Sequence, residues 1–403
     1  MNKILEGIRV VECAEFINGP AAASLLAYLG AEVIKIEQPG VGDGMRGPTS
    51  WYGISLKLPG GRSAPFEYLN RNKRDVAIDL KKEKGKELLY KLIEKSDVFL
   101  TNLRPRAITK LGLDYGTVSR YNPKLIYASS SAFGRKGPDA DSGAFDWVIH
   151  ARSGLMTTCG PGGDEPALAT PGLADHMSAW VLSYGIIAAL LARERFGIGQ
   201  EVTTSMLGAV IPLEDWVISL TSLLGAEFGR QERVKASNPI YNWYKCKDGR
   251  WLLLGLYEGD RQWPAFCKGT DIPELEKDPR FDDAAKREAN CAELVSILDK
   301  LFATRTLEEW STILRAKDLL FSPCQTISDL LSDPNVLENE YIVSVNHPTL
   351  GKVKFVGHPI QFSKTPGVVG VIAPEHGQHT EEVLLELGYT WENISELREE
   401  GVI

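Results

Sequence analysis

The sequence contains no group of cysteines or histidines with the spacing that holds a metal ion. Its six cysteines are scattered along 403 residues without a CxxC pair, and no pair among its six histidines has metal-ligand spacing. We therefore expect no metal site. We expect the cysteines to be buried free thiols in a reducing compartment.

Positive charge and long hydrophobic runs are also scarce. The formal net charge is −8 and the pI is near 5.5, which argues against nucleic acid as the main partner. The longest nearly uninterrupted apolar run, residues 179–192, is shorter than the roughly 20 residues that span a bilayer. The start of the sequence lacks the basic and apolar segments of a secretory signal. We therefore expect a soluble, cytoplasmic protein with no membrane partner.

Two common catalytic fingerprints are missing as well. The first turn between a strand and a helix reads Asn18-Gly19-Pro20, without the glycine pattern of a dinucleotide-binding turn. No serine or cysteine lies in the setting of a nucleophile elbow. These absences argue against a nicotinamide or flavin oxidoreductase and against a serine or cysteine hydrolase.

What the sequence does contain is an alternation of strands and helices. Short apolar runs alternate with amphipathic segments, which predicts a doubly wound, Rossmann-like α/β fold around a parallel sheet. Pro20 near the start of the first helix and Gly30 just after its end are typical helix boundaries. Strands are predicted at residues 8–13, 31–36, 97–100 and 125–129, with helices at 20–29 and 84–94.

The character of the chain changes after residue 225. Residues 226–325 begin with a hairpin on an Asp248-Gly249 turn and continue with helical patterns, which predicts a smaller α+β domain. We expect this domain to be inserted into a large α/β domain. The large domain consists of residues 1–225 and is completed by residues 326–403.

Two basic segments adjoin predicted strands: the first precedes a strand and the second follows one. They are residues 70–74, Asn-Arg-Asn-Lys-Arg, and residues 102–106, Asn-Leu-Arg-Pro-Arg. Ligands of open α/β sheets bind beyond the carboxyl ends of the strands, where such groups can hold phosphate. A solvated charged face is the alternative for either segment alone.

Asp175 is an isolated carboxylate at the start of an apolar helix predicted at residues 177–192. Aspartate is a preferred helix-capping residue, so a structural cap is the simpler interpretation. The positive end of the helix would favour the ionised form, and a partly desolvated carboxylate can act as a nucleophile. Both interpretations stay open on spacing alone.

The order of these segments resembles the class III CoA-transferases, the family of formyl-CoA transferase and its CaiB/BaiF-like relatives. The resemblance extends nearly end to end. The residues that support it are Gly19 and Pro20, 29–37, 70–74, 102–105, 134–138, the Asp175 segment, 199–200, 374–380, 386–389 and 401–403. It implies that Asp175 is the catalytic aspartate and that two chains form an interlocked homodimer.

The resemblance also implies a set of residues that bind CoA, as a substrate thioester and not as a resident cofactor. These residues are Ile17, Asn18, Gln38, Asn70, Asn72, Lys73, Arg74, Asn102, Arg104, Phe133 and Met206. Two of them depart from formyl-CoA transferase: Gln38 replaces an arginine and Ile17 replaces a glutamine. One contact to the CoA nucleotide and one near the reacting group are therefore expected to differ.

The activity implied is transfer of CoA from an acyl-CoA, with succinyl-CoA as one donor, to a free acid through an aspartyl-CoA thioester. Phe16, Trp51, Tyr52 and Phe145 favour a bulky or aromatic acid. The loop 257–261 is not the glycine-rich lid of oxalate-specific members, so we do not expect oxalate as acceptor.

Two alternatives remain. Related acyl-CoA racemases have a proton-exchanging histidine where this chain has Phe145, which argues against racemase or isomerase activity. The chain could also be one subunit of a heteromeric CoA-transferase, or a CoA-binding partner without turnover. Retention of Asp175 favours a catalytic chain.

Overall fold

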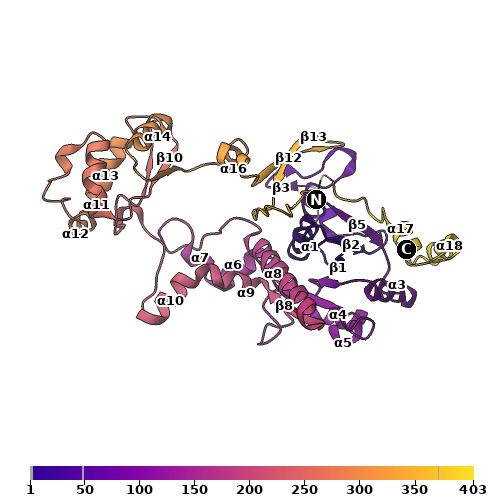
Figure 1. Ribbon diagram of the computed structural model, residues 1–403. Coiled ribbons are helices and arrows are strands. Elements are labelled where there is room, and N and C mark those ends of the chain that lie inside the picture. The colour runs from indigo at the N-terminus through magenta and orange to yellow at the C-terminus, as the bar shows by residue number, and fades with distance from the viewer. Residues whose placement is uncertain (1–2, 48–49, 371) are drawn as a thin grey trace. The chain divides into compact units, whose positions relative to one another are not determined.

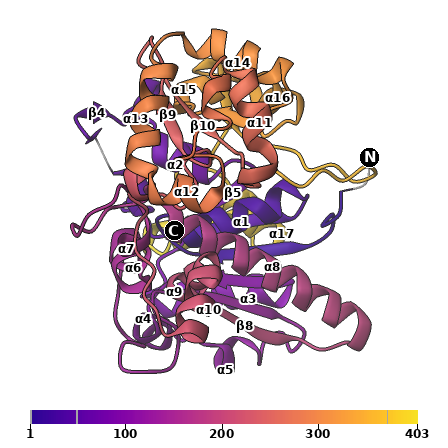
Figure 2. The same ribbon diagram turned by 90° about the vertical axis from the view of Figure 1, so that its left-hand side faces the viewer.

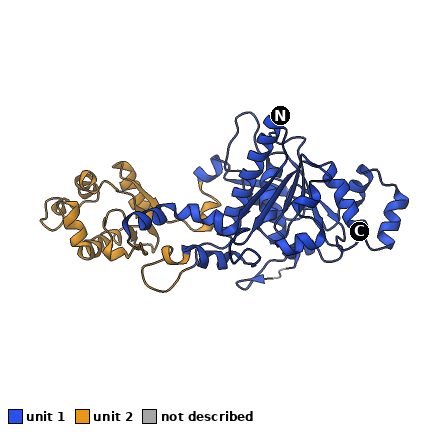
Figure 3. Cartoon of the chain, turned by 90° about the horizontal axis from the view of Figure 1, so that it is seen from below, with its two compact units in different colours: residues 1–155, 168–225, 334–403 blue, residues 156–167, 226–333 orange. Residues whose placement is uncertain are grey.

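The computed structural model describes residues 3–47, 50–370 and 372–403, which form two compact units. The larger unit contains residues 1–155, 168–225 and 334–403, and the smaller contains 156–167 and 226–333 (Figure 3). The predicted division at 225/226 is the same, whereas the chain returns to the larger unit at 334 instead of 326. Residues 156–167, expected in the large domain, belong to the smaller unit, where Arg230 donates hydrogen bonds to the carbonyl oxygens of Gly163 and Glu165.

The larger unit is built on a six-stranded parallel sheet with the order β5-β2-β1-β6-β7-β8 (Figure 1). In chain order of its strands this is 3-2-1-4-5-6, the order of a doubly wound Rossmann-type sheet. The direction of winding changes between β1 and β6. The strands are β1 Arg9–Cys13, β2 Glu32–Glu37, β5 Lys73–Ala77, β6 Val98–Thr101, β7 Ile126–Ser131 and β8 Gln200–Ser205.

Helices cover both faces of this sheet because successive strand residues point to opposite sides. Val10 packs with α1 (Asn18–Tyr28) and α8 (Leu173–Phe196) on one face, and these two helices lie side by side (Figures 1 and 2). Val11 belongs to the opposite core. The helices of that face are α3 Glu83–Glu94, α4 Pro105–Leu111, α17 Thr380–Glu386 and α18 Trp391–Glu399.

The C-terminal segment completes the sheet edge at β5. The Ala77 amide donates to Thr380 Oγ1 at 2.9 Å, and the Asp79 amide donates to the Val402 carbonyl at 2.7 Å. The side chains of Val383 and Leu397 are buried in the same core as α3. Residues more than 300 positions apart in sequence thus share one layer.

The larger unit contains further short elements, including short 3₁₀ helices labelled η. Strands β3 with β4 and β12 with β13 form two small antiparallel sheets. The elements are η1 Gly44–Arg46, β3 Ser50–Trp51, β4 Ile54–Ser55, η2 Pro59–Gly61, α2 Ala64–Leu69, α5 Tyr115–Val118, α6 Asp146–Ser153, α9 Met206–Val210, η3 Ile211–Glu214, α10 Asp215–Leu224, α16 Pro334–Glu338, β12 Ile342–His347 and β13 Gly351–Val356.

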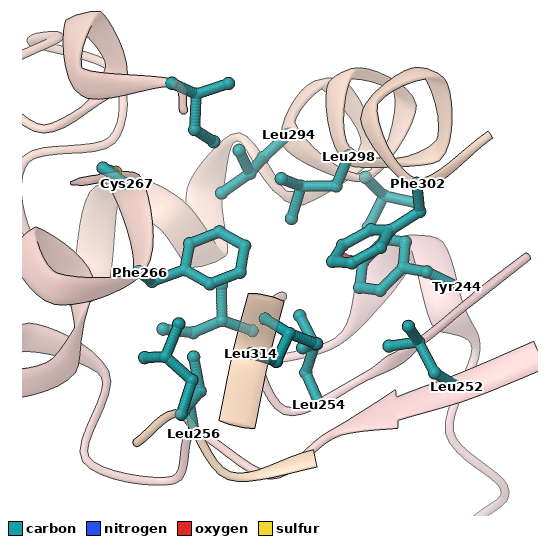
Figure 4. Packing of buried hydrophobic residues seen from close by; sticks show 14 of the residues in the cluster. Tyr244, Leu252, Leu254, Leu256, Phe266, Cys267, Leu294, Leu298, Phe302 and Leu314 are labelled. Carbon is teal, nitrogen blue, oxygen red and sulfur yellow. The ribbon is translucent and has the colours of Figure 1, made fainter. Parts of the chain in front are cut away.

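The smaller unit is α+β, with a three-stranded antiparallel sheet in the order β11-β10-β9. Gly249 has φ 79° in the predicted turn of the β9–β10 hairpin. Its core combines aliphatic and aromatic side chains, and Tyr244 stacks on Phe302 with ring centroids 5.0 Å apart (Figure 4). The elements are η4 Arg233–Lys235, β9 Trp243–Lys245, β10 Trp251–Leu254, α11 Gly259–Gly269, η5 Pro273–Leu275, α12 Ala284–Ala289, α13 Cys291–Phe302, α14 Leu307–Ala316, β11 Phe321–Pro323 and α15 Ile327–Leu330; α7 Leu155–Thr158 lies at the boundary of the two units.

Two helical stretches in the described part of the chain are long and apolar enough to cross a membrane, Leu173–Phe196 and Met206–Leu224. The first is α8, which packs on α1 and the sheet as a core helix does, so its composition is weak support for a membrane span. In the second, only 17% of the apolar window is buried within the chain, and it is divided among α9, η3 and α10.

Candidate functional site

A cavity of about 330 Å³ opens where the direction of winding of the sheet changes. Its walls come from the loop after β1, the loop after β6, the end of β7, the loop before α6, the start of α8 and the start of α9. Crevices at this point of a doubly wound sheet are the usual ligand sites of such folds. Among the predicted site residues, those that line the cavity are Ile17, Asn18, Asn102, Arg104, Asp175 and Met206.

Asp175 lies in the first turn of α8 and is half-buried. The N-cap of this helix is Gly172, with φ 78°, so the capping interpretation of Asp175 is wrong. The free amides are instead taken by Asp146 of α6, which accepts from Gly172 N and Ala174 N at 2.8 Å each. Within the described residues, the Asp175 carboxylate makes no hydrogen bond or ion pair. It is therefore free to react with a ligand in the cavity.

Burial, and secondly the charge of Asp146, raise the pKa of Asp175 to about 7. This is opposite to the expectation that the helix start would favour the ionised form. The amides that would stabilise the anion are occupied by Asp146, and its negative charge opposes a second one nearby. Near neutral pH a substantial fraction of Asp175 is ionised and poorly solvated, as a carboxylate nucleophile requires.

The two loops at this position are tied to each other by one side chain. Asn102 Oδ1 accepts from Glu15 N at 3.0 Å, and Asn102 Nδ2 donates to Glu15 O at 2.7 Å. Gly19 allows this close approach, because an added Cβ would lie 2.6 Å from Ala14 Cβ and 3.1 Å from Asn102 Cγ. Asn102 thus holds the rim of the cavity in addition to lining it.

An aromatic pair narrows the cavity. The rings of Phe16 and Phe145 meet edge to face with centroids 5.7 Å apart. Phe16 has φ 62°, a backbone conformation that is unfavourable for a residue other than glycine. Asp43 stabilises it by accepting from Phe16 N at 3.1 Å and from Met45 N at 2.8 Å. The strained backbone at this position places an apolar ring on the wall of the cavity that Asp175 also lines.

The inner wall combines amide and apolar groups. Asn18 begins α1 and donates from Nδ2 to Ser130 Oγ of β7 at 3.3 Å. Met206 is buried and begins α9, whose N-cap Ser205 accepts from Gly208 N at 2.9 Å. The wall can therefore contact both a polar chain and an apolar acyl group.

Arg104 is exposed at the mouth, with its guanidinium against the backbone of Gly143. It makes no ion pair with any residue that the structure describes. A cation without a protein partner at the rim of a cavity is suited to an anionic ligand.

The predicted basic segment 70–74 does not line the cavity, and several of its side chains bind other parts of the protein. Asn70 and Lys73 are buried, and Lys73 Nζ donates to Pro20 O at 2.8 Å and Asn70 Oδ1 at 2.9 Å. Arg74 pairs with Glu32, Glu382 and Glu386, and Asn72 Nδ2 donates to Val368 O. These side chains fasten α1 and the C-terminal segment to β5.

Gln38 and Phe133 also lie outside the cavity lining. Lys81 Nζ donates to Gln38 Oε1 at 3.4 Å, and Phe133 is half-buried after β7. Sequence analysis missed Asp43 and Asp146, which contact the site through backbone amides. Asp146 directly follows Phe145, the residue compared with the racemases, but its role depends on amides of a distant helix.

Similarity to known proteins extends over nearly the whole chain. The model of CoA-transferase family III matches residues 5–380. The chain is 33% identical to the (R)-2-hydroxy-4-methylpentanoate CoA-transferase of Clostridioides difficile over 99% of both chains. It is 32% identical to the cinnamoyl-CoA:phenyllactate CoA-transferase of Clostridium sporogenes, over 98% of this chain and 96% of the relative. The crystal structure of a CAIB/BAIF family protein from Brucella suis matches with a TM-score of 0.86 and 28% identity, over 96% of this chain and 100% of that one.

Proposed function

The chain belongs to CoA-transferase family III, and we propose that it transfers CoA from an acyl-CoA to a free organic acid through a thioester on Asp175. The observation that carries the proposal is the unpaired Asp175 carboxylate in the cavity between the β1 and β6 ends. A poorly solvated carboxylate whose pKa is about 7 is matched to covalent catalysis near neutral pH.

The reaction proceeds by two exchanges on Asp175. Its carboxylate attacks the thioester carbonyl of the donor, giving a mixed anhydride and CoA thiolate. The thiolate attacks the aspartyl carbonyl of the anhydride, releases the donor acid and leaves an aspartyl-CoA thioester. The incoming carboxylate then attacks this thioester, and the released thiolate attacks the acceptor carbonyl of the second anhydride, which restores Asp175. Every step conserves an activated acyl bond, so no metal or redox cofactor is required.

Arg104 binds the anionic part of CoA in this proposal. Arg104→Ala is expected to raise KM for the acyl-CoA about tenfold, the effect of losing one charge-assisted hydrogen bond, with a smaller change in kcat. Arg106→Ala is the matched control, because Arg106 is 84% exposed and pairs with Asp141 at the surface. Initial-rate kinetics with varied acyl-CoA concentration measure KM and kcat for both variants. Equal KM values for the two variants would remove Arg104 from the binding site.

The apolar lining favours a branched or aromatic acceptor. Phe16, Phe145 and Met206 line the cavity beside Asp175. The names of the two clostridial relatives include the 2-hydroxy acids 2-hydroxy-4-methylpentanoate and phenyllactate. Branched or aromatic 2-hydroxy acids are therefore the first candidates. The donor is the corresponding acyl-CoA or succinyl-CoA.

A panel of acyl-CoA donors and free acids, analysed by liquid chromatography and mass spectrometry, tests the reaction and the acid class together. We expect new acyl-CoA products with 2-hydroxy-4-methylpentanoate or phenyllactate and none with oxalate. Turnover confined to oxalate or formate would overturn the assigned acid class. Epimerisation of a 2-methylacyl-CoA without exchange of CoA would favour the isomerase, for which Phe145 supplies no proton.

We also propose that two copies interlock, because a broad apolar surface on the larger unit is uncovered in one chain. Within it, α10 has no buried residue, and Tyr184 on α8 and Trp216 and Leu223 on α10 are each more than three-quarters exposed. Exposed apolar side chains that gather on one surface are typical of protein–protein interfaces.

Light scattering on the purified protein is expected to give twice the 44.4 kDa chain mass, and Trp216→Glu is expected to shift it towards one chain. A second polypeptide of different mass in the native complex would favour the heteromeric alternative.

A further inference from the structure

The start of α8 is stabilised by a side chain from another helix. Asp146 is the first residue of α6, 29 positions before Asp175, and it is 9% exposed. Its Oδ2 accepts from Gly172 N, and its Oδ1 accepts from Ala174 N and, at 3.4 Å, from Asp175 N. The residue that could react and the residue that caps the helix are therefore different carboxylates on different helices.

A buried histidine lies beside Asp146, one helical turn further on. His150 is fully buried, and its Nε2 lies 3.3 Å from Asp146 Oδ2. Asp146 does not line the cavity, whereas its neighbours Phe145 and Val148 do. It is thus placed to act on Asp175 and not on a ligand.

We infer that Asp146 is a positioning residue for Asp175: it occupies the amides at the start of α8, which leaves the Asp175 carboxylate unpaired in the cavity beside a like charge. This inference rests on the proposed function, in which Asp175 is the nucleophile. It deepens that function by assigning control of the ionisation and orientation of Asp175 to a second carboxylate. Asp146 does not exchange protons with the substrate.

Titratable groups from several elements lie near Asp175. Asp146 on α6 opposes a second negative charge, and it is the named charge that, after burial, raises the pKa of Asp175 to about 7. Burial and the Asp175 charge raise the pKa of Tyr68 on α2 to about 12, so its phenol stays neutral. Burial lowers the pKa of His176, the next residue on α8. Glu15 and Arg104 lie on loops around the same cavity. Within this set, Asp146 is the carboxylate that contacts the Asp175 backbone.

Asp146→Asn tests the inference because the amide keeps one acceptor oxygen and loses the charge. The midpoint of the rise of kcat/KM with pH is expected to fall by about one unit. At pH 6 the variant then has about half of its own plateau rate, against about a tenth for the unmodified enzyme, from the ionised fractions. Asp139→Asn is the charge-matched control, because Asp139 pairs with Arg152 at the surface of α6. A loss of kcat and of Tm with an unchanged midpoint means a purely structural role and overturns the inference.

A second measurement needs no turnover. At pH 8 the fall in Tm caused by Asp146→Asn is expected to be larger in an Asp175→Asn background than in the unmodified protein. In the unmodified protein the substitution also removes the repulsion between the Asp146 and Asp175 carboxylates, which offsets part of the fall. At pH 5, where Asp175 is protonated, the two falls are expected to be equal. Equal falls at both pH values overturn the inference.

The formation of a CoA adduct on unmodified Asp175, followed by mass spectrometry, distinguishes failure of the proposed function from failure of the role of Asp146. Its absence at every pH rejects the proposed function, whereas an adduct with the same pH midpoint in Asp146→Asn rejects only the role of Asp146.

Discussion

Asp175→Asn is expected to lower the turnover of CoA transfer by at least about 1,000-fold, because an amide cannot form the anhydride or the thioester. The change keeps the size of the side chain at the start of α8, where Asp146 and not Asp175 provides the cap. Folding and helix geometry are therefore expected to survive. Steady-state turnover of the best donor and acceptor pair measures the loss.

Two observations accompany this result. Unmodified protein incubated with donor alone is expected to carry CoA on the peptide that contains Asp175, in a form cleaved by hydroxylamine, and the variant is not. Asp139→Asn, a surface change of the same kind, should retain both turnover and adduct. Transfer at the normal rate in Asp175→Asn would show that the acyl group is carried elsewhere.

The same substitution is expected to stabilise the fold at alkaline pH. The folded-state pKa of Asp175 is raised to about 7, so the ionised folded form is disfavoured. The free-energy cost of ionising Asp175 in the folded state is absent below the unfolded pKa of about 4. It grows as pH rises and is complete above about pH 7. After allowance for solvent screening of a half-buried group, Asp175→Asn should gain about 2 kcal/mol at pH 8 and little at pH 4. Unfolding by denaturant at both pH values measures it.

Glu12→Gln is expected to lower the free energy of unfolding by about 3–5 kcal/mol, the usual effect of removing one partner from a buried ionic group. Glu12 on β1 is fully buried between two fully buried lysines, with Oε1 2.9 Å from Lys35 Nζ and Oε2 2.7 Å from Lys73 Nζ. Lys35 keeps Asp43 as a partner at 2.8 Å, whereas Lys73 loses its only carboxylate among the ion pairs described.

A double-mutant cycle identifies the cause. Lys73→Met should recover part of the loss in the Glu12→Gln background, because it removes the uncompensated charge. Glu83→Gln serves as the control, since that carboxylate is 82% exposed and pairs with Lys86 on the surface of α3. Additive effects of Glu12→Gln and Lys73→Met would show that the two side chains do not stabilise each other.

The sheet and the position of Asp175 could be predicted from sequence because both depend on local patterns. Alternating strands and helices predict a parallel sheet, and an isolated acid before an apolar helix is visible in a short window. The prediction for residues 70–74 depended on their charge, their place beside a predicted strand and the family resemblance. Lys73 meets Glu12 sixty-one positions away because β5 and β1 flank β2, and no local pattern shows this pairing.

The environment of Asp175 could not be predicted for the same reason. A helix start beside an aspartate indicates a cap and an ionised carboxylate. The opposite outcome follows from Asp146, which reaches the same amides from α6. Similarly, the strained backbone of Phe16 depends on Asp43, which follows the next strand.

The contribution of the C-terminal segment to the β5 edge has a consequence for biosynthesis. The amides of Ala77 and Asp79 find their partners in Thr380 and Val402, so the sheet edge stays open until residues 380–402 have been synthesised. The smaller unit, almost all of it in the continuous stretch 226–333, has its core complete well before that moment. Because domains generally fold as units, the inserted unit can become native early in translation, while the larger unit reaches its final form only once residues 380–402 are available.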